Sequence, residues 1–213
     1  NTAESEIAKH HQSVRETGAE IHAKILFVEL EIARFDKSHV KTLLQTPTLA
    51  HFAPWLRRVR AMAPYQLAPE IEQMIAERAP TGSAAWVRLF DETTTAMRFP
   101  FDGRDVTEAE ILDALSHSDA ATRAEAGQSL STTLKSHERL LSLTLNTVAK
   151  DKLIEDGWRG FNRPVASRNL ANDVDDAVVD ALVAAVNQRN AGLTHRYYQL
   201  KAKWMGVKQL NWW

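Results

Sequence analysis

The sequence predicts an all-α fold, a multi-helical array with one short β-hairpin near residues 98–106. The chain holds only 8 Gly and 7 Pro among its 213 residues, a smaller share than the roughly 12% of average proteins. This shortage disfavours β-sandwiches, barrels and disordered chains, which use both residues freely. Apolar residues recur at helical spacing through most of the chain, and one short segment departs from that period.

The first predicted helix covers about residues 4–35. Its apolar residues step by four and three positions, which places them on one helical face: Ile21, Ile25, Val28, Ile32 and Phe35. Four shorter helices are expected to follow, over about residues 36–45, 47–63, 69–78 and 83–97. Asp36 or Ser38 is expected to cap the first of them, and Thr46 followed by Pro47 opens the second.

The segment that departs from helical spacing is the predicted hairpin. It reads Arg-Phe-Pro-Phe-Asp-Gly-Arg-Asp-Val from residue 98 to residue 106. Asp102 and Gly103 stand where a type I′ turn belongs, and this turn favours Asp-Gly because both central residues need positive φ angles. The sequence therefore predicts two short antiparallel strands joined by this pair.

Helical spacing resumes after the hairpin. Thr107 and Glu110 form the T-x-x-E pattern of a capping box, which opens a helix through residue 115. Ser118 and Asp119 are expected to cap the longest helix of the chain, over about residues 120–156. Gly157, Gly160 and Pro164 then mark an irregular stretch to residue 172. Asp173 is expected to cap the last helical region, in which Gly192 is a candidate kink.

Composition excludes several classes of function. The 26 basic and 27 acidic residues leave no basic excess, which disfavours a nucleic-acid-binding protein. The absence of Cys excludes disulfides, thiolate zinc sites and cysteine nucleophiles, and it fits a reducing compartment. No apolar run approaches the roughly 18 residues of a membrane span. We therefore expect a cytoplasmic protein with neither a nucleic-acid nor a membrane partner.

A helical zinc site needs two His at positions i and i+4. His137 is followed by Glu138, but Leu141 stands where the second His would be. His137 is therefore interpreted as a partly buried, hydrogen-bonded core residue. His10 and His11 are adjacent, diverge on a helix and are interpreted as surface residues. The residues themselves predict no catalytic residue and no metal ligand.

Two basic clusters also have ordinary explanations. Arg57, Arg58 and Arg60 are interpreted as a solvated helix face, and Lys201 and Lys203 as a favourable complement to a helix C-terminus. The sequence contains no G-x-S-x-G elbow and no phosphate-binding glycine motif. Short motifs alone lead no further than a helical domain.

Four longer strings carry a resemblance to a known family. They cover residues 64–92, 145–161, 167–182 and 195–213, and the second reads LNTVAKDKLIEDGWRGF. In this order and spacing they closely resemble the oligoendopeptidase F family, zinc metallopeptidases related to thimet oligopeptidase. The resemblance runs from about residue 20 to the last residue.

The resemblance implies an all-α enzyme that cleaves short peptides inside an enclosed channel. In the family, one Zn²⁺ is held by an H-E-x-x-H helix and a further Glu, and this chain lacks that motif. We therefore expect Zn²⁺ in the parent protein and none bound by this chain. Residues 1–106 would be the family's N-terminal, channel-rim domain, and residues 107–213 the first part of its catalytic domain, truncated before the zinc motif. Asn1 and the bare pair Trp212-Trp213 are interpreted as cut ends.

By this resemblance the chain forms channel wall and rim and is inactive alone. Its expected partners are short oligopeptide substrates and the remaining catalytic part of the same polypeptide. Tyr198 is the candidate channel residue, whereas Tyr197 is expected to pack with Leu193 and Leu200 on one helix face. The alternative is a stand-alone helical interaction module without catalytic activity.

Overall fold

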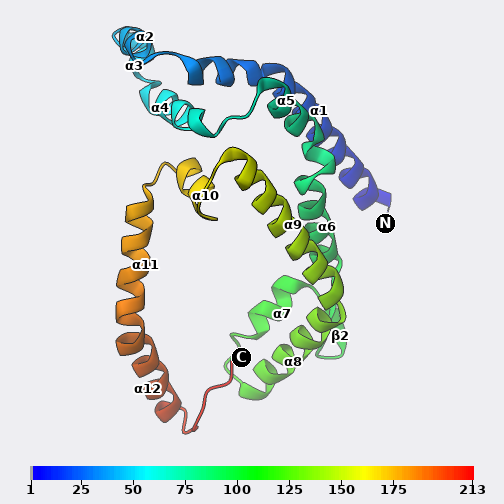
Figure 1. Ribbon diagram of the computed structural model, residues 1–213. Helices are drawn as coiled ribbons and strands as arrows, with labels where there is room; N and C mark the ends of the chain where they lie inside the picture. The colour runs from blue at the N-terminus through cyan, green and yellow to red at the C-terminus, as the bar shows by residue number, and fades with distance from the viewer. Residues whose placement is uncertain (1) are drawn as a thin grey trace. The chain divides into compact units, whose positions relative to one another are not determined.

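The computed structural model describes residues 2–213, and it consists of helices and one described two-stranded hairpin (Figure 1). The predicted all-α class is therefore confirmed. Asn1, which the sequence analysis interprets as a cut end, lies outside the described residues. The chain divides into two compact units. One comprises the residues up to Val87 together with Thr147–Asp175, and the other comprises Arg88–Asn146 and Asp176–Trp213. The domain boundary expected at residue 106 stays a prediction.

The first unit is built on the longest described helix, α1, which has 33 residues. It holds α1 (Thr2–Arg34), α2 (Lys37–Leu43), α3 (Pro47–Ala50), α4 (Ala53–Ala61), η1 (Ala63–Tyr65), α5 (Pro69–Arg78), η2 (Ala79–Thr81) and α10 (Ala166–Ala171). α1 packs against α4 and α5. The buried apolar residues of these helices are Leu30, Ala33, Leu56, Val59 and Ala76, and Glu72 and Asn169 are buried with them.

The single helix predicted over residues 47–63 is wrong, because the chain breaks it at His51 and Phe52. α3 ends at Ala50 and α4 begins at Ala53. Pro54 explains the break, since a proline ring would clash with the carbonyl of residue 50 in a continuous helix and has no N–H to donate to it. The cap of α2 is confirmed, because the Asp36 carboxylate accepts a 2.7 Å hydrogen bond from the backbone N–H of His39.

The second unit is built around the hairpin. Its elements are β1 (Phe99–Phe101), β2 (Arg104–Val106), α7 (Glu108–Ala114), α8 (Ala120–Ser136), α11 (Asp176–Asn190), η3 (Ala191–His195) and α12 (Arg196–Trp204). Two further helices, α6 (Ser83–Ala96) and α9 (Glu138–Arg159), contribute residues to both units.

The hairpin and the capping box are confirmed. Phe99 pairs with Val106 in the antiparallel register, and the φ angles of Asp102 and Gly103 are 51° and 71°, as a type I′ turn requires. Thr107 and Glu110 make both bonds of the capping box at the start of α7. The core of this unit joins the hairpin to α7 and α8, and its members are Met97, Phe99, Val106, Ile111 and Ala126.

The long helix predicted over residues 120–156 is wrong, because it is interrupted at His137. α8 ends at Ser136 and α9 begins at Glu138, while the φ and ψ angles of His137 are −101° and 3°. The partly buried, hydrogen-bonded state expected for His137 is confirmed. Its Nδ1 atom lies 3.0 Å from the carbonyl oxygen of Thr133 and 3.0 Å from the Ser136 hydroxyl.

Several details near the predicted irregular stretch also differ from the prediction. α9 continues through Gly157 and ends at Arg159, before Gly160 turns the chain with a φ angle of 79°. α10 forms inside the stretch predicted to be irregular. Asp173 has a φ angle of 54° and does not cap the last region, since α11 begins at Asp176. The candidate kink at Gly192 falls in η3, a turn of π-helix.

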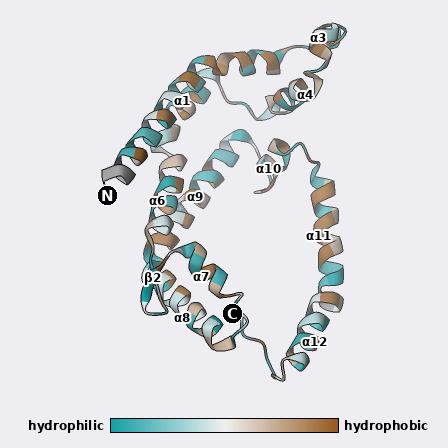
Figure 2. Ribbon diagram, turned by 180° about the vertical axis from the view of Figure 1, so that it is seen from behind, coloured by the Kyte–Doolittle hydropathy of each residue, from teal (hydrophilic) through white to brown (hydrophobic). Residues whose placement is uncertain are grey.

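Of the two Trp residues at the end of the sequence, one is exposed and the other packs against a helix. Trp212 is exposed, but Trp213 lies against Gly127 of α8, where a Cβ atom would come within 2.8 Å of the indole Cδ1. The ribbon of α11 carries several hydrophobic bands (Figure 2). Four of its apolar residues are exposed, namely Val178, Leu182, Val183 and Val186. None of the described helices is long and apolar enough to cross a membrane.

Candidate functional site

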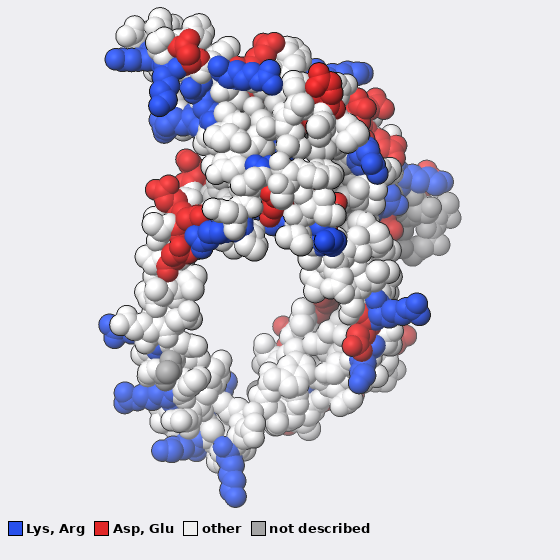
Figure 3. Space-filling model, viewed as in Figure 1, with Lys and Arg blue, Asp and Glu red and all other residues white. Residues whose placement is uncertain are grey.

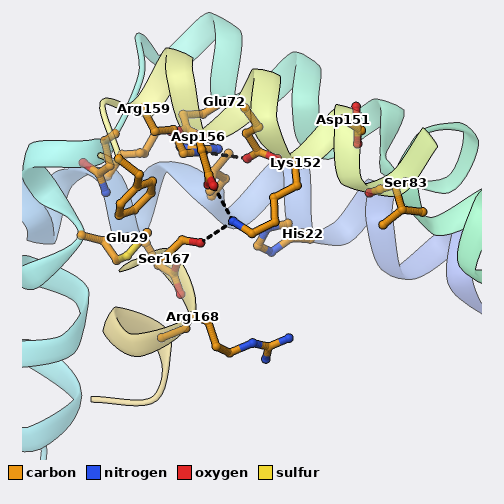
Figure 4. A pocket seen from close by; sticks show the side chains of 18 residues that line it. His22, Glu29, Glu72, Ser83, Asp151, Lys152, Asp156, Arg159, Ser167 and Arg168 are labelled. Carbon is orange, nitrogen blue, oxygen red and sulfur yellow. Dashed lines mark hydrogen bonds and ion pairs between the residues drawn. The ribbon is translucent and has the colours of Figure 1, made fainter. Parts of the chain in front are cut away.

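A cavity of about 610 Å³ in the first unit is lined by many charged side chains. α1, α5, α9 and α10 all contribute side chains to it (Figure 4). Two groups of interacting side chains lie here, one centred on Arg159 and the other on Lys152. The hydrogen bonds of the two groups indicate whether their role is catalytic or structural.

Arg159 and Glu72 form a bidentate ion pair. Arg159 Nη1 donates to Glu72 Oε1 at 2.6 Å, and Nη2 donates to Oε2 at 3.0 Å. The guanidinium makes two further hydrogen bonds, since Nε donates to Glu155 at 2.7 Å and Nη1 donates to the Tyr65 carbonyl at 3.2 Å. The backbone N–H of Leu67 donates to Glu72 Oε1 at 2.8 Å. Both charged groups are therefore satisfied inside the fold.

The electrostatics of this pair favour its charged form. Burial acts to raise the pKa of Glu72, but the hydrogen bonds from Arg159 and from Leu67 N–H outweigh it and hold that pKa below its ordinary value. The hydrogen bond to Glu72 raises the pKa of Arg159 in turn. A carboxyl that stays ionised and fully bonded cannot serve as a general acid near neutral pH. We therefore interpret the pair as a structural clamp between α5 and α9.

Lys152 and Ser167 are the second group. Lys152 Nζ donates to the Asp156 carboxylate at 2.5 Å and to the Ser167 hydroxyl at 2.9 Å. A Ser–Lys nucleophile needs a neutral amine that can accept the hydroxyl proton. Here Lys152 Nζ is the donor in both hydrogen bonds, and the Ser167 hydroxyl is the acceptor rather than the donor. These residues tie α9 to α10 and supply no nucleophile.

An aromatic stack lies beside the clamp. The rings of Tyr65 and Phe161 are parallel to within 11°, with their centroids 4.1 Å apart. Sequence reasoning identified none of these partners, since no spacing rule pairs residue 65 with 161 or residue 72 with 159. The only signal was that residues 64–92 and 145–161 both carry the family resemblance.

Tyr198, the candidate channel residue, lies in the second unit and lines a different groove of about 700 Å³. α12 forms one side of this groove, and residues 208–212 form the other. Tyr198 is 51% exposed. Tyr197 is equally exposed, and its ring contacts that of Tyr198 edge-on, with the two ring centroids 5.4 Å apart. The packing of Tyr197 with Leu193 and Leu200 stays a prediction.

The other sequence interpretations have mixed outcomes. His10 and His11 are exposed, as expected. Arg57 and Arg58 are also exposed, but the interpretation of Arg60 as part of a solvated face is wrong. Its guanidinium is partly buried and donates to the carbonyl of Phe35, just beyond the end of α1. A basic side chain at this place satisfies a carbonyl that the helix leaves open.

The described residues do not fit a metal ion. Among the side chains that the structure describes, no group of three or more His, Asp or Glu comes together in a way that could hold one. The zinc that the family resemblance implies therefore has no ligand set among these side chains.

The chain is similar to known oligopeptidases. A family model described as Oligopeptidase F matches residues 31–99. The chain is 24% identical, over 222 aligned residues, to the group B oligopeptidase PepB of Streptococcus agalactiae. That alignment covers 99% of this chain and 37% of PepB, so the chain spans little more than a third of this curated relative.

The fold is similar to a solved structure as well. The crystal structure of oligoendopeptidase-F from Enterococcus faecium matches with a TM-score of 0.77 and 19% sequence identity. The match covers 90% of this chain and 39% of that one. The resemblance to the N-terminal part of the oligoendopeptidase F family, which the sequence indicates, is therefore confirmed.

Proposed function

We propose that the chain is part of a zinc-dependent metalloendopeptidase that hydrolyses short oligopeptides in an enclosed channel. In this proposal the chain forms wall and rim of the channel, with residues 1–106 as the rim domain, and the rest of the polypeptide carries the catalytic centre. The observation that carries the proposal is the alignment with an oligopeptidase over 99% of this chain but 37% of that protein. We propose a cytoplasmic location, with no nucleic-acid and no membrane partner.

The chemistry of a channel wall is recognition. An extended peptide that leaves water must find partners for its backbone N–H and C=O groups. The groove at Tyr198 offers a phenol and the amide of Gln199, which donate and accept hydrogen bonds. We propose that Tyr198 contacts peptide substrates here. Confinement by such walls would admit a flexible chain and exclude a folded protein.

The catalytic part of the proposal is tested with the purified chain. Elemental analysis should find far less than one zinc ion per chain, and internally quenched peptides should not be cleaved above the blank rate. One tightly bound zinc per chain, or peptide hydrolysis that a chelator abolishes, would overturn the assignment as channel wall.

The reading frame beyond Trp213 separates the two hypotheses of the sequence analysis. Continuation into an H-E-x-x-H motif supports the peptidase part. A stop codon directly after Trp213 contradicts it and favours the stand-alone interaction module.

The role of Tyr198 is tested in the complete polypeptide. Tyr198→Ala should raise KM for short peptides with little change in kcat, because a wall residue contributes binding and no chemistry. Tyr197→Ala is the matched control, since both side chains have the same exposure and lie on the same helix. Equal effects of the two substitutions would contradict the assignment of Tyr198.

A further inference from the structure

The charge of the chain is balanced overall but distributed unevenly. Residues 181–213 contain five basic residues and neither Asp nor Glu. The five are Arg189, Arg196, Lys201, Lys203 and Lys208. In Figure 3, blue side chains gather over α12 and the segment after it, and no red atoms lie among them on this face. The groove at Tyr198 therefore lies in the most basic stretch of the second unit.

The groove itself is lined mainly by hydrogen-bond donors. Lys208 brings an ammonium, while Gln199, Gln209 and Asn211 bring amides. The phenol of Tyr198 and the indole of Trp212 add one donor each and two exposed rings. None of its lining residues, all within the described chain, is Asp or Glu. A groove of this volume falls within the roughly 300–1,000 Å³ typical of ligand sites.

We propose that this groove binds acidic oligopeptides, with a peptide carboxylate beside Lys208 and the peptide backbone bonded to the amides. The inference rests on the proposed function, because that function makes a peptide the ligand. The surrounding basic side chains contribute through their summed field, which attracts an anion before contact. Each exposed charge pair by itself contributes little to binding. The preference for acidic peptides therefore comes from the summed field of these charges, which salt screens.

A nucleic acid is the other anionic ligand to consider. Binding a single strand requires cations that follow successive phosphates along the groove. Here Lys208 is the one Lys or Arg among the lining residues, and the amides around it suit a peptide backbone. The groove therefore fits a peptide better than a phosphate chain.

The test compares two fluorescein-labelled peptides of equal length, one carrying Glu at several positions and the other Lys at the same positions. Fluorescence anisotropy with the whole chain should show the acidic peptide binding at least about tenfold more tightly at low salt. This advantage should shrink as salt is added. A third peptide with Gln at those positions measures binding without charge.

Two substitutions locate the effect. Lys208→Gln should weaken binding of the acidic peptide several-fold and leave the Gln peptide unchanged. Lys135→Gln, which removes an exposed lysine of α8 outside the groove, should change neither. Circular dichroism checks that both variants keep their helices, as expected for exposed positions.

The possible failures are distinguishable. Equal binding of the acidic and basic peptides overturns the charge preference and leaves the proposed function standing. Absence of binding by all three peptides overturns both the inference and the contact proposed for Tyr198. A single-stranded oligonucleotide that binds more tightly than the acidic peptide overturns the choice of ligand.

Discussion

Arg159 and Glu72 lie 87 positions apart in the sequence and meet through two hydrogen bonds of 2.6 and 3.0 Å. Their side chains are only 13% and 10% exposed. The pair joins the end of α9 to α5, and the Tyr65–Phe161 stack reinforces the same junction. Two distant segments of the chain are thus held together in the first unit by a bidentate charge pair and a ring contact.

Breaking this pair should destabilise the chain strongly. Arg159→Ala removes the guanidinium and leaves the Glu72 carboxylate buried without its main partner. The loss in unfolding free energy should be about 3 kcal/mol. The change is measured as a shift of the urea midpoint followed by circular dichroism.

A double variant separates the contribution of the ion pair to the unfolding free energy from the destabilisation caused by an unpaired buried charge. Replacing both residues by Met should recover most of the loss, because no buried charge remains. Lys9→Ala is the control, since it removes an exposed ion pair with Glu6 and should cost less than about 1 kcal/mol. If Arg159→Ala were no worse than Lys9→Ala, the pair would not be a clamp.

Acid should weaken the cap of α7. The backbone N–H of Thr107, the Arg104 guanidinium and the Thr107 hydroxyl all bond the Glu110 carboxylate, and together they lower its pKa to about 2. A carboxyl whose pKa is lower in the folded state stabilises the fold above its ordinary pKa of 4.5. That contribution is lost as the pH falls from about 5 towards 2.

The measurement is the melting temperature as a function of pH. Glu110→Gln should melt below the parent chain at pH 7, because a neutral amide makes weaker bonds with Arg104 and the helix N-terminus. The difference should shrink as the pH falls towards 2, where the pKa of the parent carboxyl lies and about half of these carboxyls are protonated. A difference that stays constant between pH 7 and pH 2 would contradict this account.

Local features were those that the sequence predicted well. The caps at Asp36 and Thr107 and the turn at Asp102-Gly103 each depend on residues within four positions of one another. Such features are decided by backbone sterics and short hydrogen bonds, which the residue types reveal directly. Their geometry in the structure matches the prediction.

The failures have physical causes too. Sequence periodicity does not predict the break at His137, because the leucines keep their helical spacing on both sides of it. A single non-helical residue leaves that spacing unchanged. The break before Ala53 could have been predicted from Pro54, because proline has no N–H to donate within a continuous helix. The spacing of apolar residues does not take this into account. Arg60 and the clamp were missed because long-range partners leave no periodic pattern in the sequence.

The hairpin turn should tolerate Asn but not Ala. Gly103 has a φ angle of 71°, where a Cβ atom costs about 1–2 kcal/mol, so Gly103→Ala should lower the unfolding free energy by about that amount. Asp102→Asn keeps a residue type that accepts positive φ and should be nearly neutral. Urea denaturation of both variants makes the comparison, and equal stability would show that the turn is not under this constraint.

Two glycines within helices should respond to Ala in opposite directions. Gly157 has open space around its Cα, so Gly157→Ala should gain about 0.5–1 kcal/mol of unfolding free energy from helix propensity. At Gly127, the new Cβ atom would come within 2.8 Å of the Trp213 indole. Gly127→Ala should displace that ring and lower the unfolding free energy by about 1 kcal/mol.

Removing the Trp213 ring shows whether helix propensity or the contact with the indole dominates the effect of Ala at position 127. In a Trp213→Ala background the added Cβ atom has no indole to meet, so Gly127→Ala should become stabilising, like Gly157→Ala. The urea midpoints of the four combinations of these two substitutions measure this coupling. Destabilisation by Gly127→Ala that persists without the indole would mean that Trp213 does not pack on α8. In that case the indole would be as free as the exposed ring of Trp212.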